Sequence, residues 1–599
     1  MSFFWKSKSY RAPRPANPAN AIYLGCFRDV TKTQAGAELT YAGERHLLLI
    51  GPNGSGKGTR LLVPNLLRLQ DRSVIVIDPK GELTAITARQ RSKFSRIVVL
   101  NPFDVLGLGG TGFNPLAALD PDSPTFVDDA AGLAEALIKI EPGEKDPHWS
   151  ESARNLVAAL IMWEVKEAKR RGRVPHMENV RRLLTEPSEY ERDTDGKSKL
   201  VRGLKITAAR MVAYGDFEIE SLIGRFLRDN NEISGIQSAA DRQTTWMLSP
   251  LMRANMAKNG IDFASLKEQP TTVYVILPAE RMRTHNVWLR LVIVSALRSL
   301  YRPGGLRTLF MLDEFAQLGH LPPIEDAFGL VRGFGVQLWP ILQDLNQLKE
   351  LYGKRWETMT ANSGVVQGFA PNDLTTAEWM SRRAGDSTVA AAGYNKGDAL
   401  SSAGHGSTSQ STGLSFSQAR RPLFLPQELM DLPAGCGVFW PAGTSKTVPF
   451  IAPSYWQVPE LAAHADANPY FPSARTTPAL PRRKPVSHRP SLALAVTKAM
   501  ARDSYKLAKW SAPHIKHGLY VVGMATIRFA RRSYVFALYE LPPIMREFYA
   551  TTRAICLGLA DAYRAGKASY RHNRQKGAAK SGPPAPPSLA ITSDLRRPR

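Results

Sequence analysis

The segment Gly51-Pro-Asn-Gly-Ser-Gly-Lys57 contains the residue types that bind phosphate. Glycines let the backbone curl so that its N–H groups point at phosphate oxygens, and the final lysine reaches the β- and γ-phosphates of a nucleotide. The segment follows an apolar run, His46–Ile50, and precedes a predicted helix, 58–69, which is the context that this motif requires. The residues predicted to form this phosphate-binding loop are Gly51, Pro52, Asn53, Gly54, Ser55, Gly56, Lys57, Gly58 and Thr59.

Position 58 departs from the usual form of the motif. The residue after the lysine is ordinarily a serine or threonine whose hydroxyl binds Mg²⁺. Here that residue is Gly58, so the hydroxyl is missing at this position. Either Thr59 or a water molecule would replace it as the magnesium ligand.

Two adjacent acids follow another apolar run, in Leu309-Phe-Met-Leu-Asp313-Glu314. This order places both carboxylates at the end of a buried strand, which we expect to lie beside the strand of the phosphate-binding loop. Asp313 would hold Mg²⁺, directly or through water, and Glu314 would polarise the attacking water. The alternative is a pair of acids that caps a helix, but the loop upstream favours the catalytic interpretation.

Three more residues follow or precede apolar runs. Gln343, at the end of the run 336–342, would sense the γ-phosphate or orient water. Arg332 lies in a glycine-containing turn and would stabilise γ-phosphate charge in the site of a neighbouring subunit. A surface role is the alternative for both. Asp78, after the run 73–77, would either couple nucleotide state to movement or cap the next helix.

Short apolar runs closed by turn residues must position these side chains. Such runs, with helices between them, are typical of strands buried on both faces and predict an α/β fold with a mostly parallel sheet. Pro340 interrupts one run, and because proline cannot donate to a ladder we expect a bulge or a sheet edge there. The runs are 46–50, 73–77, 96–100, 271–277, 308–312, 336–342, 365–369 and 436–440.

Changes in composition and in the spacing of apolar residues divide the chain into five parts. Residues 1–20 are predicted to be a flexible segment and 21–119 the first part of the α/β domain, which carries the phosphate-binding loop. Apolar residues at helical spacing predict an all-α insertion at 120–262. The α/β domain continues over 263–460, with a flexible Ser-, Gly- and Ala-rich loop at 388–418. A basic, Pro-rich and helical extension with a disordered end covers 461–599.

Positive charge is concentrated in the last part. The chain carries 78 Lys and Arg against 53 Asp and Glu, a formal net charge of +25. Residues 471–599 hold 24 of these bases and 5 of the acids, a net of +19, which leaves +6 for the other residues. Such a tail predicts contact with nucleic acid or an anionic membrane surface, with solubility as the alternative.

Composition also excludes some classes of protein. Three widely separated cysteines, Cys26, Cys436 and Cys556, give neither a CxxC zinc site nor a disulfide framework, and they fit a reducing cytoplasm. No run approaches the roughly 18 apolar residues that a membrane span needs. We therefore expect neither a secreted disulfide scaffold nor an integral membrane protein.

Taken together, the motifs resemble the type IV coupling proteins, the conjugative DNA-transfer ATPases of the TraG and TraD kind. The resemblance covers roughly residues 21–456, and the motifs occur in the family's order. It implies a RecA-like motor domain interrupted by an all-helical domain that recognises substrate. The matching segments are GPNGSGKG, LLVPNLL, IDPKGEL, NPFD, FNPL, DPHW, SARNL, LDEFAQLG and LQDLNQL.

The resemblance also implies roles and partners. Lys57, Asp313 and Glu314 match the family's two nucleotide motifs, Gln343 its glutamine motif, and Arg332 an arginine proposed to act across subunits. The implied ligands are ATP and Mg²⁺. The implied partners are DNA, a relaxase or relaxosome, type IV secretion channel proteins and further copies of the chain, usually in a hexamer. The implied place is the cytoplasmic face of the bacterial inner membrane.

One departure from the family leaves three hypotheses. The family usually begins with transmembrane helices, and Lys57 comes too early to leave room for two spans before it. We predict an ATP-driven coupling protein that recruits relaxase–DNA, and possible protein substrates, to a secretion channel, with a partner supplying the anchor. The alternatives are a soluble cytoplasmic DNA translocase or helicase, and a docking receptor that does not hydrolyse ATP, which Gly58 would favour.

Overall fold

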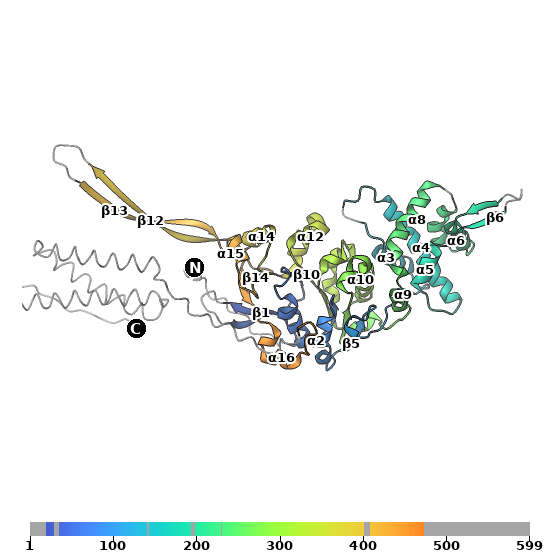
Figure 1. The fold of residues 1–599 in the computed structure, drawn as a ribbon, viewed down its shortest axis with the longest axis horizontal. Helices are drawn as coiled ribbons and strands as arrows, with labels where there is room; N and C mark the ends of the chain where they lie inside the picture. Colours follow the sequence, from blue (N-terminus) through green and yellow to red (C-terminus); the bar gives the residue numbers. More distant parts are fainter. Residues whose placement is uncertain are drawn as a thin grey trace, which may run out of the picture. The chain divides into compact units, whose positions relative to one another are not determined.

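An eleven-stranded β-sheet is the framework of the described residues (Figure 1). The computed structural model describes residues 19–28, 35–140, 143–192, 198–228, 230–400 and 408–471, all within the first of two compact units, residues 1–479. The second unit, 480–599, lies outside the described residues, as do most of the predicted N-terminal segment and of the basic extension. In spatial order the strands are β2 (Ala35–Tyr41), β1 (Ile22–Arg28), β15 (Val448–Ile451), β14 (Cys436–Pro441), β11 (Ser363–Phe369), β3 (His46–Ile50), β10 (Val336–Leu342), β9 (Arg307–Leu312), β4 (Arg72–Ile77), β8 (Thr271–Val275) and β5 (Arg96–Leu100).

Most of the sheet is parallel. All neighbours from β11 to β5 pair in parallel, whereas β14, β15, β1 and β2 extend the sheet with antiparallel pairing. Strands such as β3 and β4 are buried along their whole length, because both faces of a parallel sheet are covered. This confirms the predicted α/β class with a mostly parallel sheet.

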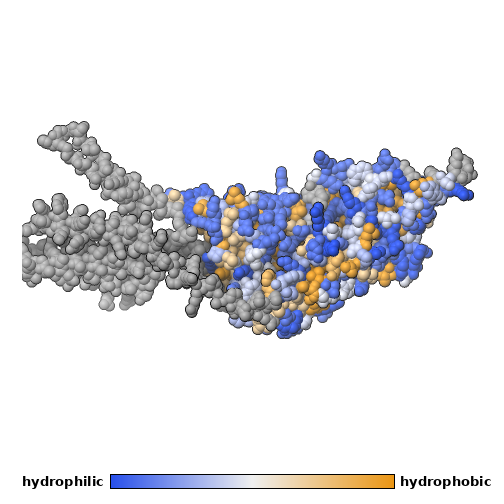
Figure 2. Space-filling model, viewed as in Figure 1, coloured by the Kyte–Doolittle hydropathy of each residue, from blue (hydrophilic) through white to orange (hydrophobic). Residues whose placement is uncertain are grey.

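Two apolar cores lie on opposite faces of this sheet. Leu47 and Leu49 belong to one core and Leu48 and Ile50 to the other, because successive strand residues point to opposite faces. On the face shown in Figure 2, hydrophilic residues cover most of the described surface. The first core includes residues of α1 (Val63–Arg68), α2 (Glu82–Arg91) and α16 (Pro459–His464), and the second includes residues of α10 (Ala279–Leu300), α11 (Pro322–Leu330), α12 (Leu345–Tyr352), α13 (Trp356–Asn362), α14 (Leu374–Ala384) and α15 (Pro426–Met430).

A mainly helical insertion separates β5 from β8, at the place where the sequence predicts it. Its central helix, α4, packs against α3, α5, α7 and α8, and α3 also packs against α10. A two-stranded ribbon, β6 (Glu189–Arg192) with β7 (Ser198–Val201), departs from the expectation of helices alone. The helices are α3 (Phe126–Leu137), α4 (His148–Arg170), α5 (Met177–Leu184), α6 (Gly203–Val212), α7 (Phe217–Ile223), α8 (Asn231–Thr244) and α9 (Pro250–Met256).

A second ribbon replaces the loop expected at 388–418. Strands β12 (Asp386–Leu400) and β13 (Thr408–Pro422) pair antiparallel along their whole length, from Asp386 opposite Pro422 to Leu400 opposite Thr408. The expectation of a loop is wrong for these residues. Backbone hydrogen bonds between the strands define the ribbon, so it forms without the alternation of bulky apolar residues that marks a strand in a sequence.

The position of β10 corrects two further expectations. It lies between β3 and β9, so the strand of the paired acids is not beside the strand of the phosphate-binding loop. It is also a central strand, and its register with both neighbours runs without a shift, so Pro340 needs neither an edge nor a bulge. Residues 336–340 pair with β9, and β10 pairs with β3 only from Ile341 on. The proline therefore precedes the ladder to β3, where a missing N–H costs no strand bond.

The two longest helices of the described residues are α4 and α10, with 23 and 22 residues. The middle of α10 carries Arg290, whose side chain is fully buried. None of the helices in the described part of the chain combines the length and the apolar character needed to span a bilayer.

Candidate nucleotide-binding site

The phosphate-binding loop joins β3 to the helix that follows it. The backbone N–H of Gly51 donates to the carbonyl of Leu342 at 3.0 Å, which ties the start of the loop to the end of β10. Gly54 and Gly56 have φ angles of +81° and +86°, a region that residues with a side chain rarely adopt. These two glycines therefore allow the curled backbone that the sequence predicts.

The helix after the loop begins with a wide turn. Residues Gly58–Leu62 form a π-helical turn that leads into α1, and Pro64 at the start of α1 has no N–H to donate. Lys57 is the N-terminal flanking residue of this turn. Helix N–H groups without intrahelical partners, together with the helix dipole, favour an anion at this end.

Lys57 lies at the centre of the site and is 8% exposed. Its Nζ donates to the carbonyl of Gly51 at 2.6 Å, so the side chain folds back over the loop. Burial lowers the pKa of Lys57, and the nearby carboxylates of Asp313 and Glu314 oppose that shift. The ammonium group and the two acids, far apart in sequence, thus lie in one place.

Asp313 and Glu314 follow β9, as predicted. Asp313 accepts a hydrogen bond from the backbone N–H of Glu314 at 3.0 Å. The pKa of Asp313 is raised to about 7, mainly by burial and then by the charge of Glu314, while the charge of Lys57 opposes this shift. Glu314 has φ 50° and ψ 41°, a left-handed conformation that costs a non-glycine residue roughly 1–3 kcal/mol. Such strain is found where a side chain must be held in one direction.

Gln343 completes this group. It follows β10, the strand between β3 and β9, and its Nε2 donates to Oε2 of Glu314 at 2.9 Å. Its own backbone N–H donates to the side chain of Gln347 at 3.0 Å. The ends of three consecutive strands therefore bring Lys57, Gln343 and the two acids to one edge of the sheet, the edge at which open α/β sheets bind ligands.

Arg332 lies at the opposite end of the strands, where β10 begins. It is in a 3-10 turn, η7 (Val331–Phe334), that comes before β10, whereas Gln343 comes after it. The seven residues of β10 separate the two by about 23 Å, at about 3.3 Å per residue. Arg332 pairs with Glu44, which precedes β3, at 3.9 Å, and its side chain is 57% exposed. The structure therefore does not bring Arg332 to the phosphate-binding loop of its own chain.

Asp78, after β4, caps the next helix. Its carboxylate accepts hydrogen bonds from the backbone N–H and the hydroxyl of Thr84, at 2.8 and 2.7 Å, in the first turn of α2. This favours the capping interpretation. Asp78 also lies near enough to Asp313 for its charge to raise the pKa of that group.

Two features of β3 and the loop that follows it have no signal in the sequence. His46, the first residue of β3, is buried, and it accepts the N–H of Leu338 at 3.0 Å while its other ring nitrogen lies 3.2 Å from the carbonyl of Ala327. Burial lowers the pKa of His46 to about 4. The hydroxyl of Ser55 is buried with no hydrogen-bond partner among the described residues. Both follow from the packing of segments that are distant in sequence.

The ligands that could hold a metal ion are sparse. In the part of the chain that the structure describes, no group of three or more His, Cys, Asp or Glu side chains has the arrangement of a protein metal site. The sequence predicts two oxygen ligands near Lys57, the carboxylate of Asp313 and the hydroxyl of Thr59. The Thr59 hydroxyl lies 3.4 Å from the carbonyl of Gly56. A metal ion here would need further ligands from phosphate or water.

The fold and this cluster define a RecA-like P-loop protein with a nucleotide-binding NTPase fold. The family model described as "Type IV secretory system Conjugative DNA transfer" matches residues 17–444. The chain belongs to this family.

Individual relatives agree with that assignment. The chain is 28% identical over 443 residues to the conjugal transfer protein TraG of Escherichia coli, covering 70% of this chain and 66% of that protein. It is 28% identical over 369 residues to protein VirD4 of Agrobacterium fabrum, covering 59% of this chain and 52% of that protein. The match thus spans about two thirds or less of the length of these relatives.

Solved structures share the fold. The unbound bacterial conjugative coupling protein TrwBdeltaN70 matches with a TM-score of 0.52 at 19% identity, over 68% of this chain and 84% of that one. The plasmid coupling protein TrwB in complex with ADP and Mg²⁺ matches with a TM-score of 0.51 at 18% identity, over 74% of this chain and 96% of that one.

Proposed function

We propose that this protein is an ATP-driven coupling protein that recruits relaxase–DNA complexes to a type IV secretion channel and powers their transfer. The observation that carries the proposal is the convergence of Lys57, Asp313, Glu314 and Gln343 at one edge of the sheet, in a chain of the conjugative DNA-transfer family. The names of the TraG and VirD4 relatives support the role in conjugation and type IV secretion.

The loop residues fit a nucleoside triphosphate. The buried Ser55 hydroxyl has no partner among the described residues, and Lys57 donates to Gly51, a carbonyl that it can exchange for a phosphate oxygen. With the N–H groups at the start of the helix, these donors would hold the β- and γ-phosphates. The plasmid coupling protein TrwB, which shares the fold, has been solved in complex with a non-hydrolysable ATP analogue, and this supports ATP as the ligand.

Magnesium fits beside Asp313. When bound, the ion would neutralise charge on the β- and γ-phosphates. A neighbouring cation would offset the burial that raises the pKa of Asp313, so that the carboxylate is ionised when it serves as a ligand. Gly58 offers no hydroxyl, which leaves Thr59 or water to complete the coordination.

Glu314 and Gln343 are proposed to act on the attacking water. Glu314 accepts a proton from the water or orients the water. The Gln343 amide donates to the Glu314 carboxylate at 2.9 Å and so fixes the direction of that carboxylate. The left-handed backbone at Glu314 holds the side chain toward the site.

Arg332 is proposed to serve the site of a neighbouring copy. Its exposure and its place at the far edge of the sheet support an action between subunits of a homo-oligomer, which we propose is a hexamer. We further propose that the helical insertion recognises the relaxase–DNA substrate. The ring would lie at the cytoplasmic face of the inner membrane, held by secretion channel proteins or another membrane partner.

Phosphate release and plasmid transfer test the proposal together. The purified full chain is expected to hydrolyse ATP in the presence of Mg²⁺, and Lys57→Ala is expected to abolish both hydrolysis and transfer in a mating assay. Lys80→Ala is a matched control, because Lys80 carries the same charge in the turn after β4 and donates no hydrogen bond to the loop. Normal transfer by Lys57→Ala would refute the motor role, and hydrolysis that persists in Glu314→Gln would refute the catalytic assignment.

A further inference from the structure

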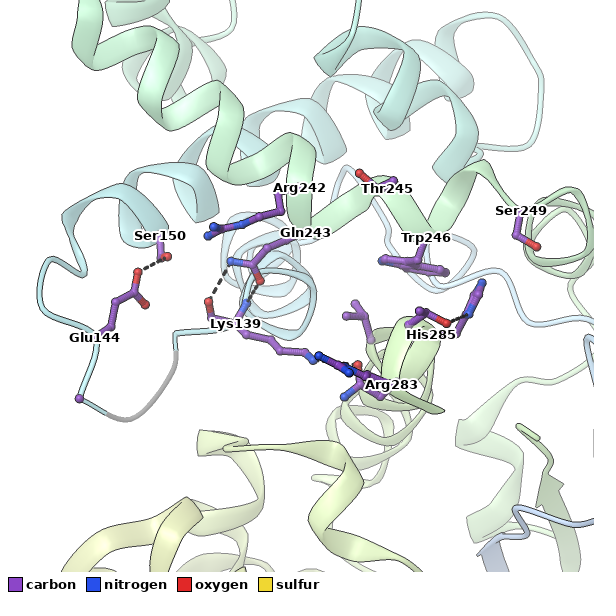
Figure 3. Close-up of a pocket in the computed structure, with 14 residues that line it drawn as sticks. Lys139, Glu144, Ser150, Arg242, Gln243, Thr245, Trp246, Ser249, Arg283 and His285 are labelled. Atoms are coloured by element: carbon purple, nitrogen blue, oxygen red, sulfur yellow. Dashed lines mark hydrogen bonds between the residues drawn. The ribbon is translucent and has the colours of Figure 1, made fainter. Parts of the chain in front are cut away.

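A cavity of about 980 Å³ lies away from the phosphate-binding loop, between the helical insertion and α10 (Figure 3). The end of α8 and the turn η4 (Thr245–Leu248) form one side, and the first turns of α10 form another. The segment after α3 closes it with Lys139 and Glu144. The cavity thus joins the two parts of the fold that lie on either side of β8 in the sequence.

Positive charge dominates the lining. Lys139, Arg242 and Arg283 face one acid, Glu144, whose carboxylate already accepts the hydroxyl of Ser150 at 2.8 Å. Arg242 and Arg283 are exposed, and neither side chain makes an ion pair or hydrogen bond with another residue in the described part of the chain. An anion in this cavity could therefore bind both guanidinium groups without breaking another ion pair or hydrogen bond of their side chains.

The uncharged lining is suited to a phosphodiester. Hydroxyls of Thr245, Ser249 and Thr284 line the cavity. The amides of Gln243 and Asn286 also line it, but they are bonded to Lys139 and Gln317. Arg and Lys together with Ser and Thr are among the side chains that contact DNA phosphates and sugars. An acidic protein segment would use the arginines but has less use for the three hydroxyls.

Hydrogen bonds lead from this lining to Glu314. The Gln243 side chain accepts the N–H of Lys139 at 2.6 Å and donates to its carbonyl at 3.0 Å. Lys139 Nζ donates to the Asn286 side chain at 2.7 Å, and Asn286 in turn donates to the carbonyl of Gln317 at 2.8 Å. The N–H of Gln317 donates to the carbonyl of Glu314 at 2.8 Å. Every step is a direct bond, so the cavity wall and the Glu314 turn are one connected unit.

Arg290 reinforces the same connection one turn along α10. Its guanidinium is buried and donates to the carbonyl of Ala136, at the end of α3, and to the carbonyls of Leu318 and His320, which follow Glu314. Arg290 therefore bonds the end of α3 and the middle of α10 to the segment that follows Glu314.

We propose that this cavity binds the sugar–phosphate backbone of a DNA strand through Arg242 and Arg283, and that Asn286 is a positioning residue that couples its occupancy to Glu314. The proposal rests on the proposed function and names where substrate meets the motor. A phosphate that attracts Lys139 competes with its bond to Asn286 and alters the bond of Asn286 to the Glu314 turn.

The binding half is tested without hydrolysis. The full chain is titrated into a fluorescein-labelled single strand of DNA, and into the matching duplex, at several salt concentrations. The double variant Arg242→Gln with Arg283→Gln is expected to weaken binding to at least one of them and to reduce the salt slope by roughly 1.4 for a single strand, two contacts at about 0.7 each. The basic residues beyond 471 are the same in all variants, so the difference reports the cavity.

A matched pair of variants separates this cavity from general charge. Arg281 is exposed on the same helix and does not line the cavity. Arg281→Gln is expected to bind DNA as the wild type does, whereas Arg283→Gln is expected to weaken binding. Equal effects of the two variants on DNA binding would overturn the proposal. The proposal would also be overturned if the double variant bound polyglutamate more weakly than the wild type but bound DNA equally well.

The coupling half is read as a ratio. DNA-stimulated hydrolysis divided by hydrolysis without DNA is expected to fall toward one in Asn286→Ala, and also in Asn286→Asp, which keeps an acceptor for Lys139 but loses the donor to Gln317. Thermal unfolding checks that both variants fold. A wild-type ratio in both variants would overturn the coupling. Absence of ATPase activity in the wild type would instead refute the proposed function and leave the binding test standing.

Discussion

Gln343 donates a hydrogen bond to Glu314 at 2.9 Å, although the two residues belong to different strands and are 29 positions apart. The bond joins the end of β10 to the end of β9 at the edge where Lys57 lies. The direction of the Glu314 carboxylate therefore depends on the Gln343 amide. Gln343 follows β10, the strand between those that carry the acids and the phosphate-binding loop.

This bond predicts different effects for its two partners. Glu314→Gln removes the group that acts on water and is expected to lower ATP hydrolysis by about 10²-fold or more. Gln343→Ala leaves the carboxylate in place but undirected, and the loss of a hydrogen bond to a charged group predicts roughly a tenfold decrease. Phosphate release measures both, and binding of a fluorescent ATP analogue is expected to persist in both. Full activity of Gln343→Ala would exclude the orienting role.

Gly58 predicts a gain of function. Outside its own helix, a Cβ at this position would meet no atom closer than Cδ2 of Leu83 at 4.0 Å, so there is room for the Cβ of a serine. Gly58→Ser is expected to restore the missing hydroxyl and to lower several-fold the Mg²⁺ concentration that half-saturates hydrolysis, about 1 kcal/mol for one added ligand bond. Gly58→Ala, with the same Cβ and no hydroxyl, is the control. Thr59→Ala is expected to raise the Mg²⁺ requirement only if Thr59 supplies the ligand.

The position of Arg332 predicts complementation between subunits. Lys57→Ala lacks a working loop and Arg332→Ala lacks the arginine, so each alone is expected to hydrolyse little ATP. Mixed oligomers contain sites with an intact loop beside an intact arginine, and their activity is expected to exceed that of either variant. Arg307, which pairs with the same Glu44 at 3.3 Å, provides the control variant Arg307→Ala. A mixture no more active than its components would place Arg332 outside the site.

His46 predicts a loss of stability in acid. Its pKa is about 4 in the fold and about 6.5 in an unfolded chain, so the folded state favours the neutral ring. Protonation therefore favours unfolding, and the contribution to stability decreases as the pH falls below about 6.5 and is fully lost below about 4. Between about pH 7 and pH 5 this amounts to about 2 kcal/mol. Urea unfolding at the two pH values is expected to show a smaller decrease for His46→Gln than for the wild type.

The local features of the fold were predictable from the sequence. The runs at 46–50 and 73–77 lie within β3 and β4, because a strand buried on both faces must be continuously apolar. The run at 96–100 matches β5, although this last strand of the sheet is only partly buried. The loop glycines were predictable for a similar reason, since two of them adopt positive φ angles. In each case a few adjacent residues determine the outcome.

The relations between distant segments were not predictable. Nothing in the run 336–342 shows that this strand enters between β3 and β9, and without that order Pro340 indicates an edge or a bulge. The ribbon of β12 and β13 forms from residues that resemble a linker in composition, because backbone pairing does not require bulky side chains. The roles of Gln343 and Arg332 stay predictions, although the structure places one at the loop and the other across the sheet.

The short ladder between β3 and β10 divides the sheet into two leaves. Only Ile341 and Leu342 pair with β3, and the rest of the seam is closed by the imidazole of His46 bonded to Leu338. One leaf carries the phosphate-binding loop, and the other carries Glu314 and its acidic neighbour. A hinge at this seam would lengthen or shorten the distance from the Lys57 ammonium to the carboxylates of Asp313 and Glu314, while each leaf keeps its own hydrogen bonds.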